Sequence, residues 1–280
     1  MNSIDKQIKI VSAGQEAPAT ISLIGEEPLS IRVQGMPYAV VMRTPGDEKA
    51  HVAGFCLGEG IVDHPGDITN IAFCDGEDTN VVTVTLTADR RSRIAEHLDR
   101  RTYISQTSCG ICGKSIVDDL VQALSPVSDG DPLDNRGALD RLIHLGDDQP
   151  LRAKTRAAHA AAIYDDGMRR LSLAEDVGRH NALDKAIGSG LDQGVDLSQC
   201  LAFLSGRVSY EMAIKAARVG LQVLGSVSGP TVLGVRLLDR LGVTLAAFIR
   251  PPRFTVYTHP QRVLVKGQPL QGLPPFEVDD

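Results

Sequence analysis

The sequence predicts an α/β protein, with a layered and mostly parallel sheet in its second half and a smaller β-rich α+β part before it. Short apolar strands alternate with amphipathic helices along residues 158–249. Short apolar or alternating runs separated by Gly and Pro fill residues 21–86. A segment rich in Pro, Gly and Asp at 125–137 separates the two patterns. It predicts an N-terminal domain of residues 1–124 and a second domain of residues 125–280.

The elements of the first part follow from its apolar runs. A helix opens after Arg43-Thr44-Pro45-Gly46-Asp47 and continues to about Gly60, with Phe55 among its inward residues. Arg90, Arg91 and Arg93 begin a charged amphipathic helix, which we expect to present a solvated face. The strands predicted in this part are 21–24, 29–33, 39–42 and 81–86.

The second half has a more regular order of elements. A helix near 139–145 precedes two strands that are joined by the turn Asp165-Asp166-Gly167. The later strands are each followed by a helix, which favours parallel strands in one sheet. The predicted strands are 158–164, 171–174, 201–204, 222–227 and 243–249, the last of which closes the set. The predicted helices begin near Asn181, Ser209 and Thr231.

Composition excludes several classes of protein. The chain has 280 residues, 42% of them hydrophobic and 23% charged, and a net charge of −6, which argues against a nucleic-acid-binding protein. No apolar run approaches the length of a membrane span, and the polar start is not that of a signal peptide. The five cysteines are too few and too scattered for a secreted disulfide framework. We therefore expect a cytoplasmic protein.

Cys109 and Cys112 are the residues whose chemistry stands out most. Each is followed by glycine, and the loop that holds them ends at a predicted helix beginning near Ser115. The helix N-terminus and the neighbouring Lys114 both favour the thiolate, which predicts reactive cysteines. A single CxxC pair is compatible with half of a zinc site, a dithiol–disulfide couple or a sulfur carrier.

The remaining cysteines, Cys56, Cys74 and Cys200, lie in apolar segments and are predicted to be small buried hydrophobic residues. They have no ligand-like spacing, so a single chain does not supply the four ligands that zinc needs. A zinc site shared by the CxxC pairs of two chains remains an alternative.

Loops after the predicted parallel strands carry a second pattern. Ligands of open α/β sheets bind beyond the carboxyl ends of the strands. Three of the four loops there contain arginine, and three lead into a helix through glycine, a combination that suits phosphate groups. We expect a phosphate-bearing, nucleotide-like ligand at this edge. The loops are 175–181, 205–209, 226–231 and 248–253.

Histidines and acidic residues near these loops divide into two groups. His180, beside Arg179 at a helix start, is placed to hydrogen-bond a ligand. His144 and His159 lie among small or apolar residues and are predicted to be structural. The acidic residues Glu175, Asp176 and Asp184 are predicted to form structural ion pairs with Arg179 and Lys185.

Assembled in order, these segments resemble the FdhD family of formate-dehydrogenase accessory sulfurtransferases over nearly the whole chain. The resemblance rests on 27–33, 42–46, 54–61, 107–113, 175–185, 205–207 and 256–262. One stretch departs from the family pattern: where relatives often have a Thr-Gly-Gly type sequence, the chain reads Thr155-Arg156-Ala157-Ala158-His159. Fewer glycines make the backbone stiffer there.

The resemblance implies a fold like that of cytidine deaminases for the second domain. Those enzymes carry H-x-E at one helix start and P-C-x-x-C at the next. The matching positions here are His180-Asn181-Ala182 and Ser205-Gly206-Arg207-Val208-Ser209. Both the acid–base glutamate and the thiolate ligands are missing, which excludes deamination and leaves an anion-binding pocket.

The resemblance also implies a sulfur-transfer activity. Sulfur would be taken as a persulfide from an IscS-type cysteine desulfurase, with Cys109 as the persulfide-bearing residue. It would then pass to the molybdenum bis-pyranopterin guanine dinucleotide cofactor before that cofactor enters formate dehydrogenase. Cys112 would relay the sulfur, or resolve a stalled persulfide as a disulfide. A homodimer is expected on the same ground.

Cofactor binding is predicted at the ends of the strands. The family's cofactor-binding stretch corresponds to Phe248, Ile249, Arg250, Pro251, Pro252 and Arg253. The loop argument adds Arg179, His180 and Arg207, and guanosine diphosphate (GDP) should mimic the cargo. Two other functions remain open: a dithiol–disulfide oxidoreductase that uses the CxxC pair, and a non-enzymatic cofactor-binding chaperone.

Overall fold

The computed structural model describes residues 1–74, 79–101, 124, 126–127, 148–250, 253–265 and 268–273, without the side chains of 95–101 and 199. Several predictions therefore lie outside the described residues. They concern Cys109 and Cys112 with the helix after them, the helix at 139–145, His144, and Pro251 with Pro252. The predicted domain boundary near 125 also borders this part of the chain and stays a prediction.

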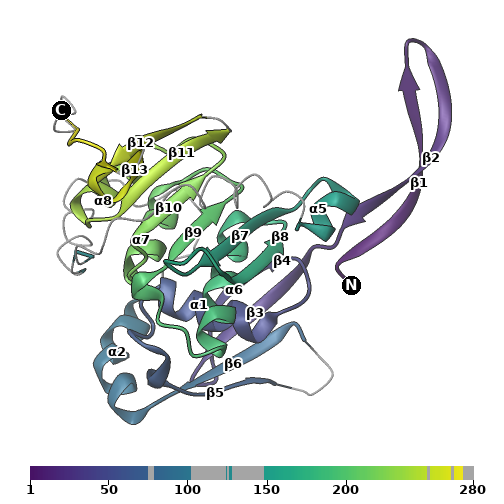
Figure 1. Ribbon diagram of the computed structural model, residues 1–280. Coiled ribbons are helices and arrows are strands. Elements are labelled where there is room, and N and C mark those ends of the chain that lie inside the picture. The colour runs from purple at the N-terminus through teal and green to yellow at the C-terminus, as the bar shows by residue number, and fades with distance from the viewer. Residues whose placement is uncertain are drawn as a thin grey trace.

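The chain begins with a long antiparallel hairpin, β1 (Ser3–Ser12) and β2 (Gln15–Ile24), whose strands are in register along their whole length. Ala13 and Gly14 at its tip both have positive φ, as a tight hairpin turn requires. Figure 1 shows this ribbon projecting away from the rest of the molecule. The prediction at 21–24 found part of β2, whereas β1 was missed.

A four-stranded sheet with the order β4-β3-β6-β5 follows the hairpin. Its strands confirm the predictions at 29–33, 39–42 and 81–86, and β5 was not predicted. Helix α1 also confirms its prediction. The elements are β3 (Glu27–Val33), β4 (Met36–Arg43), α1 (Glu48–Gly58), the short helix Pro65–Asp67, β5 (Ile68–Phe73), β6 (Val81–Leu86) and α2 (Ala88–Arg101).

Helix α2 departs from its prediction at one residue. Arg90 is only 6% exposed, not part of a solvated face. Its guanidinium donates hydrogen bonds to the carbonyls of Gly60 and Ile61, both at 2.8 Å, and pairs with Asp63. The arginine binds carbonyl groups just beyond the end of α1, so its charge stabilises the end of that helix and does not face solvent.

The second sheet has six strands in the order β12-β11-β10-β9-β7-β8. Its strands and helices confirm the positions predicted for them from residue 158 onward. The elements are α5 (Pro150–Thr155), β7 (His159–Tyr164), β8 (Arg170–Asp176), α6 (Arg179–Asp192), the short helix Leu197–Gln199, β9 (Leu201–Leu204), α7 (Tyr210–Arg218), β10 (Val223–Ser226), α8 (Val232–Arg240), β11 (Thr244–Arg250) and β12 (Arg253–Thr258). The short helix Pro260–Arg262 and the hairpin Leu264–Val265 with Gln268–Pro269 end the described chain.

Two expectations about this sheet were wrong. Only β9–β10 and β10–β11 are parallel pairs, whereas β7–β8, β7–β9 and β11–β12 are antiparallel, so the sheet is mixed. Strand β11 is not the last strand of the sheet, as the sequence predicted, because β12 pairs with it as an antiparallel edge strand. Since β7 is antiparallel to both β8 and β9, the strands β8, β9, β10 and β11 nevertheless run in one direction. Their carboxyl ends meet at one edge.

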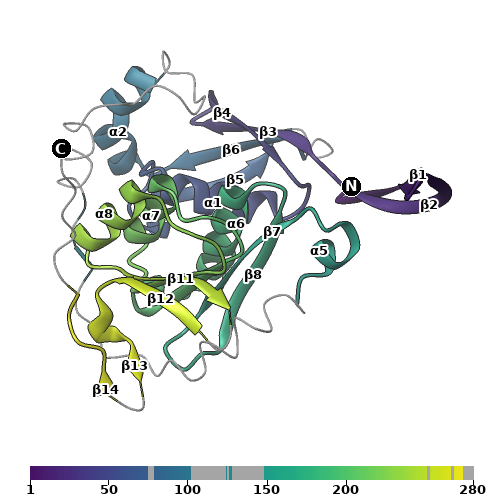
Figure 2. The same cartoon turned by 90° about the horizontal axis from the view of Figure 1, so that it is seen from above.

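Helices α1 and α6 lie between the two sheets (Figure 2). They cross in backbone contact, because a Cβ at Gly54 would lie 1.9 Å from the carbonyl oxygen of Asp184 and one at Gly188 would lie 1.8 Å from that of Ala50. Only glycine allows this approach. One apolar core joins residues of both sheets, for example Leu29 and Val84 with Ala161 and Leu224. Among the described residues, no helix is long and apolar enough to cross a membrane.

The cysteines outside the CxxC pair differ in exposure. Cys56 and Cys200 are buried as predicted, and burial raises the pKa of both thiols, that of Cys200 to about 11. Cys74 is exposed, contrary to the prediction, and its sulfur lies 3.0 Å from Thr83 Oγ1. It follows β5, where the chain leaves the sheet, so an apolar sequence neighbourhood did not imply burial.

Candidate functional site

The predicted strand-end loops lie against one another at the carboxyl edge of the second sheet. Gly206 packs on Arg179, since a Cβ at Gly206 would lie 3.1 Å from Arg179 Cβ. The Ser226 hydroxyl donates to the carbonyl of Gly206 at 2.6 Å, and the amide of Phe248 donates to the carbonyl of Ser228 at 3.1 Å. We call the loops 175–181, 205–209 and 226–231, with 248–250, Arg253 and His159, the strand-end surface.

Arg179, at the start of α6, is the cation best placed to receive a ligand. Its Nε atom is buried and has no hydrogen-bond partner among the described residues. A buried guanidinium N–H without a partner is costly, and an anionic acceptor would satisfy it. Gly206 leaves space beside the guanidinium stem, so the site suits a group with phosphate-like acceptors.

His159 belongs to this site, although the sequence predicted a structural role for it. Its Nδ1 lies 3.3 Å from the hydroxyl of Ser205, which also accepts a hydrogen bond from the amide of Ala160. Partial burial lowers the pKa of His159, and the positive charges of Arg179 and Arg152 lower it further. His159 begins β7, which runs against its neighbours, so its amino end meets their carboxyl ends. The placement of His159 at this surface follows only from the directions of the strands, for which the sequence has no local signal.

His180 is engaged by the next helix. Its Nε2 lies 2.9 Å from a carboxylate oxygen of Glu211 on α7 and 3.5 Å from the hydroxyl of Ser209. The hydrogen bond to His180 lowers the pKa of Glu211. The pair fixes the imidazole where α6 and α7 begin, and it places a carboxylate beside the basic loops. Sequence reasoning missed Glu211, because nothing in its neighbourhood indicates the contact.

The other predicted cofactor-binding residues that the structure describes divide between surface and core. Arg207, Phe248, Arg250 and Arg253 are exposed, and Arg250 lies opposite Arg253 in the β11–β12 pairing. Ile249 is only 4% exposed and packs in the core, so its side chain is not available to a ligand.

Phe248 has a left-handed backbone conformation, with φ of 49°, at an irregularity in β11. Such a conformation is strained for a residue with a bulky side chain. The turn brings its half-exposed ring over Gly229, where an added Cβ would lie 2.6 Å from the ring. The result is an aromatic surface beside the basic loops, suited to stacking with a flat ring system.

Buried ion pairs lie among the strands and helices that carry the strand-end surface. Asp176 pairs with Lys185 at 2.8 Å, as predicted. Asp184 instead pairs with Lys215 on α7, with distances of 2.9 and 3.0 Å, so its predicted partners were wrong. Glu175 accepts hydrogen bonds from the amides of Leu151 and Arg152 in α5 and not from the predicted cations.

The stretch that departs from the family pattern follows α5. Arg156, with φ of 57°, occupies the left-handed position that ends this helix. Glycine is the residue that this conformation favours, so an arginine there carries strain. The stretch leads directly into His159 and therefore borders the strand-end surface.

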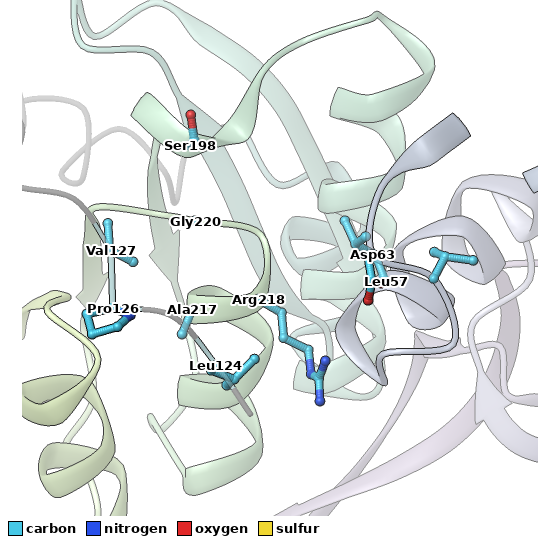
Figure 3. A pocket seen from close by; sticks show the side chains of 10 residues that line it. Leu57, Asp63, Leu124, Pro126, Val127, Ser198, Ala217, Arg218 and Gly220 are labelled. Atoms are coloured by element: carbon cyan, nitrogen blue, oxygen red, sulfur yellow. The ribbon is translucent and has the colours of Figure 1, made fainter. Parts of the chain in front are cut away.

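A cavity of about 420 Å³ lies elsewhere, between α1 and α7. Figure 3 shows Leu57 and Asp63 on one side, with Arg218 and Gly220 on the other. Gly220 precedes β10, so the cavity is at the amino edge of the sheet. It is separate from the strand-end surface.

Comparison with known proteins assigns the chain to a family. A family model described as the FdhD/NarQ family matches residues 24–264. The chain belongs to the FdhD/NarQ family. A relative from Streptomyces coelicolor, named Sulfur carrier protein FdhD, is 36% identical over 97% of this chain and 100% of its own length. One of the same name from Mycobacterium tuberculosis is 36% identical over 92% of this chain and 97% of its own.

A crystal structure of a formate dehydrogenase accessory protein from Desulfotalea psychrophila is similar to this FdhD/NarQ chain throughout. The TM-score is 0.74 and the identity 25%, over 94% of this chain and 100% of the other. The likeness agrees with the mixed α/β fold and the expected family.

The part of this FdhD/NarQ chain that the structure describes contains no cluster of three or more His, Cys, Asp or Glu side chains able to hold a metal ion. In the stretch that the resemblance predicts to match the deaminase thiolates, Ser205 contacts His159 and Ser209 contacts His180. The likeness to cytidine deaminases itself remains a prediction.

Proposed function

We propose that this FdhD/NarQ protein is a sulfur carrier that activates a formate dehydrogenase by delivering sulfur to its molybdenum bis-pyranopterin guanine dinucleotide cofactor. The names of the relatives support sulfur transport, and that of the structural neighbour supports the formate dehydrogenase connection. The sulfur is carried on Cys109 and comes from an IscS-type cysteine desulfurase. The cofactor is the cargo, held at the strand-end surface.

Loading the carrier requires no change in oxidation state overall. The Cys109 thiolate attacks the outer sulfur of the desulfurase persulfide, and a new S–S bond forms on Cys109. The S–S bond of the desulfurase breaks, and its cysteine leaves as a thiolate. The sequence signals that lower the cysteine pKa, Lys114 and the predicted helix start, favour this exchange.

Delivery requires the outer sulfur to leave Cys109 as sulfide and become a ligand of the metal. Two electrons are needed, and the second cysteine supplies them when the Cys112 thiolate attacks the inner sulfur of the persulfide. A Cys109–Cys112 disulfide forms as sulfide departs, and a cellular dithiol reductant restores both thiols. In the alternative relay, Cys112 first takes the outer sulfur from Cys109.

The observation that supports the cargo assignment is the buried Nε of Arg179 on the strand-end surface, which has no hydrogen-bond partner in the part of the chain that the structure describes. The cargo has diphosphate groups, whose oxygens suit Arg179 and the exposed arginines Arg207 and Arg250. Its guanine bases suit the exposed ring of Phe248 by stacking. A dithiol–disulfide oxidoreductase would leave this basic surface without a role.

The first test is the intact mass of the protein after incubation with a cysteine desulfurase and cysteine. Wild type is compared with Cys109→Ala and Cys112→Ala, each with and without reductant. We expect wild type to gain sulfur that reductant removes, and Cys109→Ala to gain none. A loss of two protons on oxidation, without added sulfur in any variant, would support the dithiol couple instead.

The non-enzymatic alternatives are separated by two further measurements. Metal analysis of protein purified without chelator detects zinc held between CxxC pairs of two chains. A chaperone without sulfur transfer would bind GDP and yet leave formate dehydrogenase active when Cys109 is replaced. We expect no stoichiometric zinc, and inactive formate dehydrogenase in cells that contain only Cys109→Ala.

A further inference from the structure

Glu211, in the first turn of α7, places a carboxylate beside the basic loops of the strand-end surface. Its Oε2 atom lies 2.9 Å from Nε2 of His180. The hydrogen bond with His180 lowers the pKa of Glu211, and the positive charge of Arg179 lowers it further, so the group is ionised at neutral pH. A fixed negative charge repels phosphate groups, so a surface that bound phosphate alone would be stronger without it.

The other carboxylates of this surface are used within the fold. Both oxygens of Glu175 accept hydrogen bonds from amides at the start of α5, and Asp176 is buried against Lys185. The Glu211 side chain differs, because it is 49% exposed and, in the described part of the chain, pairs with His180 alone. A carboxylate has about four acceptor positions, so His180 leaves most of them open to a ligand.

The imidazole of His180 holds this carboxylate in a defined position. His180 lies in the first turn of α6, and its Nε2 is also 3.5 Å from the hydroxyl of Ser209, the residue before α7. The contact therefore joins the first turns of two helices. Arg179 directly precedes His180, so the guanidinium that suits phosphate and the carboxylate are neighbours. A polar group that is fixed before binding loses little freedom when a ligand arrives, which favours discrimination between ligands.

Guanine is the common base whose edge fits a carboxylate. Its ring N1–H and its exocyclic amino group are adjacent donors, and together they match the two oxygens of one carboxylate. Adenine has an acceptor nitrogen beside its amino group, so a carboxylate there would face a lone pair. Hypoxanthine keeps the N1–H of guanine and lacks the amino group. A carboxylate therefore separates guanine from other bases that are attached to the same diphosphate.

We propose that Glu211 selects guanine, by accepting hydrogen bonds from the N1–H and the amino group of one guanine of the cargo, next to the diphosphate at Arg179. The assignment rests on the proposed function, because it takes the guanine dinucleotide cofactor as the cargo. That cofactor has two guanine bases, so the second is left for Phe248 at the other end of the surface. Adenine nucleotides carry the same phosphate groups, and Glu211 gives the surface a means to reject them.

A divalent cation is the other ligand that a carboxylate beside phosphate groups could hold. Such a cation would bridge Glu211 to the diphosphate and would strengthen the binding of every nucleotide alike. Selection of guanine instead changes the ratio between nucleotides and needs no cation. Titrations in EDTA and in magnesium chloride therefore separate the two.

The test is the dissociation constant for three nucleotides, measured by calorimetric titration: GDP, inosine diphosphate (IDP) and adenosine diphosphate (ADP). In EDTA, we expect wild type to bind IDP and ADP at least about tenfold more weakly than GDP, because each lacks a charge-assisted hydrogen bond. Glu211→Gln keeps the size of the side chain but turns an amide donor toward the donors of guanine. It should weaken GDP about 10- to 150-fold and change ADP less than about threefold. Asp192→Asn, which removes an exposed carboxylate at the far end of α6, should bind all three like wild type.

The ratio of the GDP and ADP dissociation constants separates base selection from damage to the site, since damage weakens both nucleotides. Equal weakening of GDP and ADP by Glu211→Gln, or a GDP preference that persists in it, would overturn the assignment. So would an effect of Glu211→Gln that appears only with magnesium. The wild-type preference for GDP over IDP tests the assignment without a variant, and its absence would overturn it while the phosphate contacts stand. A wild type that binds no nucleotide would overturn the cargo proposal as well.

Discussion

The carboxylate of Asp176 and the ammonium group of Lys185 lie 2.8 Å apart, and both side chains are almost completely shielded from solvent. Thr44 connects to both, because its amide donates to Asp176 and its carbonyl accepts from Lys185. The pair therefore fastens the loop before α1 to the strand and helix that present Arg179. It links the first sheet to the strand-end surface.

Replacing Lys185 should destabilise the fold strongly. Lys185→Met leaves the Asp176 carboxylate buried without its cation, and breaking such a pair costs about 3–5 kcal/mol. Urea unfolding should show this loss in the free energy of unfolding. Lys154→Met, which removes a half-exposed lysine, should cost less than about 1 kcal/mol. Equal values for the two variants would show that the buried pair has no special role.

Replacing Arg179 should weaken nucleotide binding and leave the fold intact. Arg179→Met removes the guanidinium but keeps an apolar stem against Gly206. A lost charge-assisted hydrogen bond costs about 1.5–3 kcal/mol, so the dissociation constant for GDP should rise about 10- to 150-fold. Calorimetric titration measures it. The control Arg169→Met removes an exposed arginine at the opposite end of β8, and it should bind GDP like wild type.

Arg250 provides a separate test of the other end of the strand-end surface. It is exposed and lies opposite Arg253, so Arg250→Ala removes one of two adjacent positive charges. We expect weaker GDP binding and a smaller dependence of that binding on salt, since one fewer cation faces the phosphates. Titrations at two salt concentrations measure both effects. If GDP affinity and its salt dependence stay at wild-type values, the cargo does not extend to β11.

The positions of strands and helices were predictable because their signals are local. Gly229 and Pro230 end one strand, and Thr231 accepts a hydrogen bond from Gly234 at the start of the next helix. Strand direction was not predictable, since it depends on which strands pair. The order β9-β7-β8 makes the sheet mixed, and it also brings His159 to the candidate site.

The environments of several charged residues were also not predictable from the sequence, because they depend on contacts between distant segments. Arg90 was expected on a solvated face and Asp184 in an ion pair with a nearby cation, yet both are buried against partners from distant segments. Glu211 carries no local signal at all, and its contact with His180 exists only because α6 and α7 begin side by side. The positions of Arg179 and Arg207 at this edge of the sheet were predictable, because glycine and arginine follow apolar strands directly.

His51 should make the stability of the protein depend on pH. It is fully buried in α1, and burial lowers its pKa well below the usual 6.5, with the positive charges of Lys185, Lys215 and Arg43 adding to the effect. Above pH 6.5 the imidazole is neutral in both folded and unfolded chains. Below it, the unfolded chain binds a proton that the folded chain excludes, so the free energy of unfolding falls by up to about 1.4 kcal/mol per pH unit.

The measurement is a series of urea unfolding curves between pH 7 and pH 5. In His51→Gln the buried side chain at position 51 no longer titrates, so the free energy of unfolding of this variant should fall less steeply with acid than that of wild type. His64→Gln, which removes an exposed histidine, should keep the wild-type slope. The comparison of slopes is unaffected by any constant loss of stability that glutamine causes in the core. If the free energy of unfolding falls equally steeply with acid in wild type and in His51→Gln, His51 accepts its proton inside the fold.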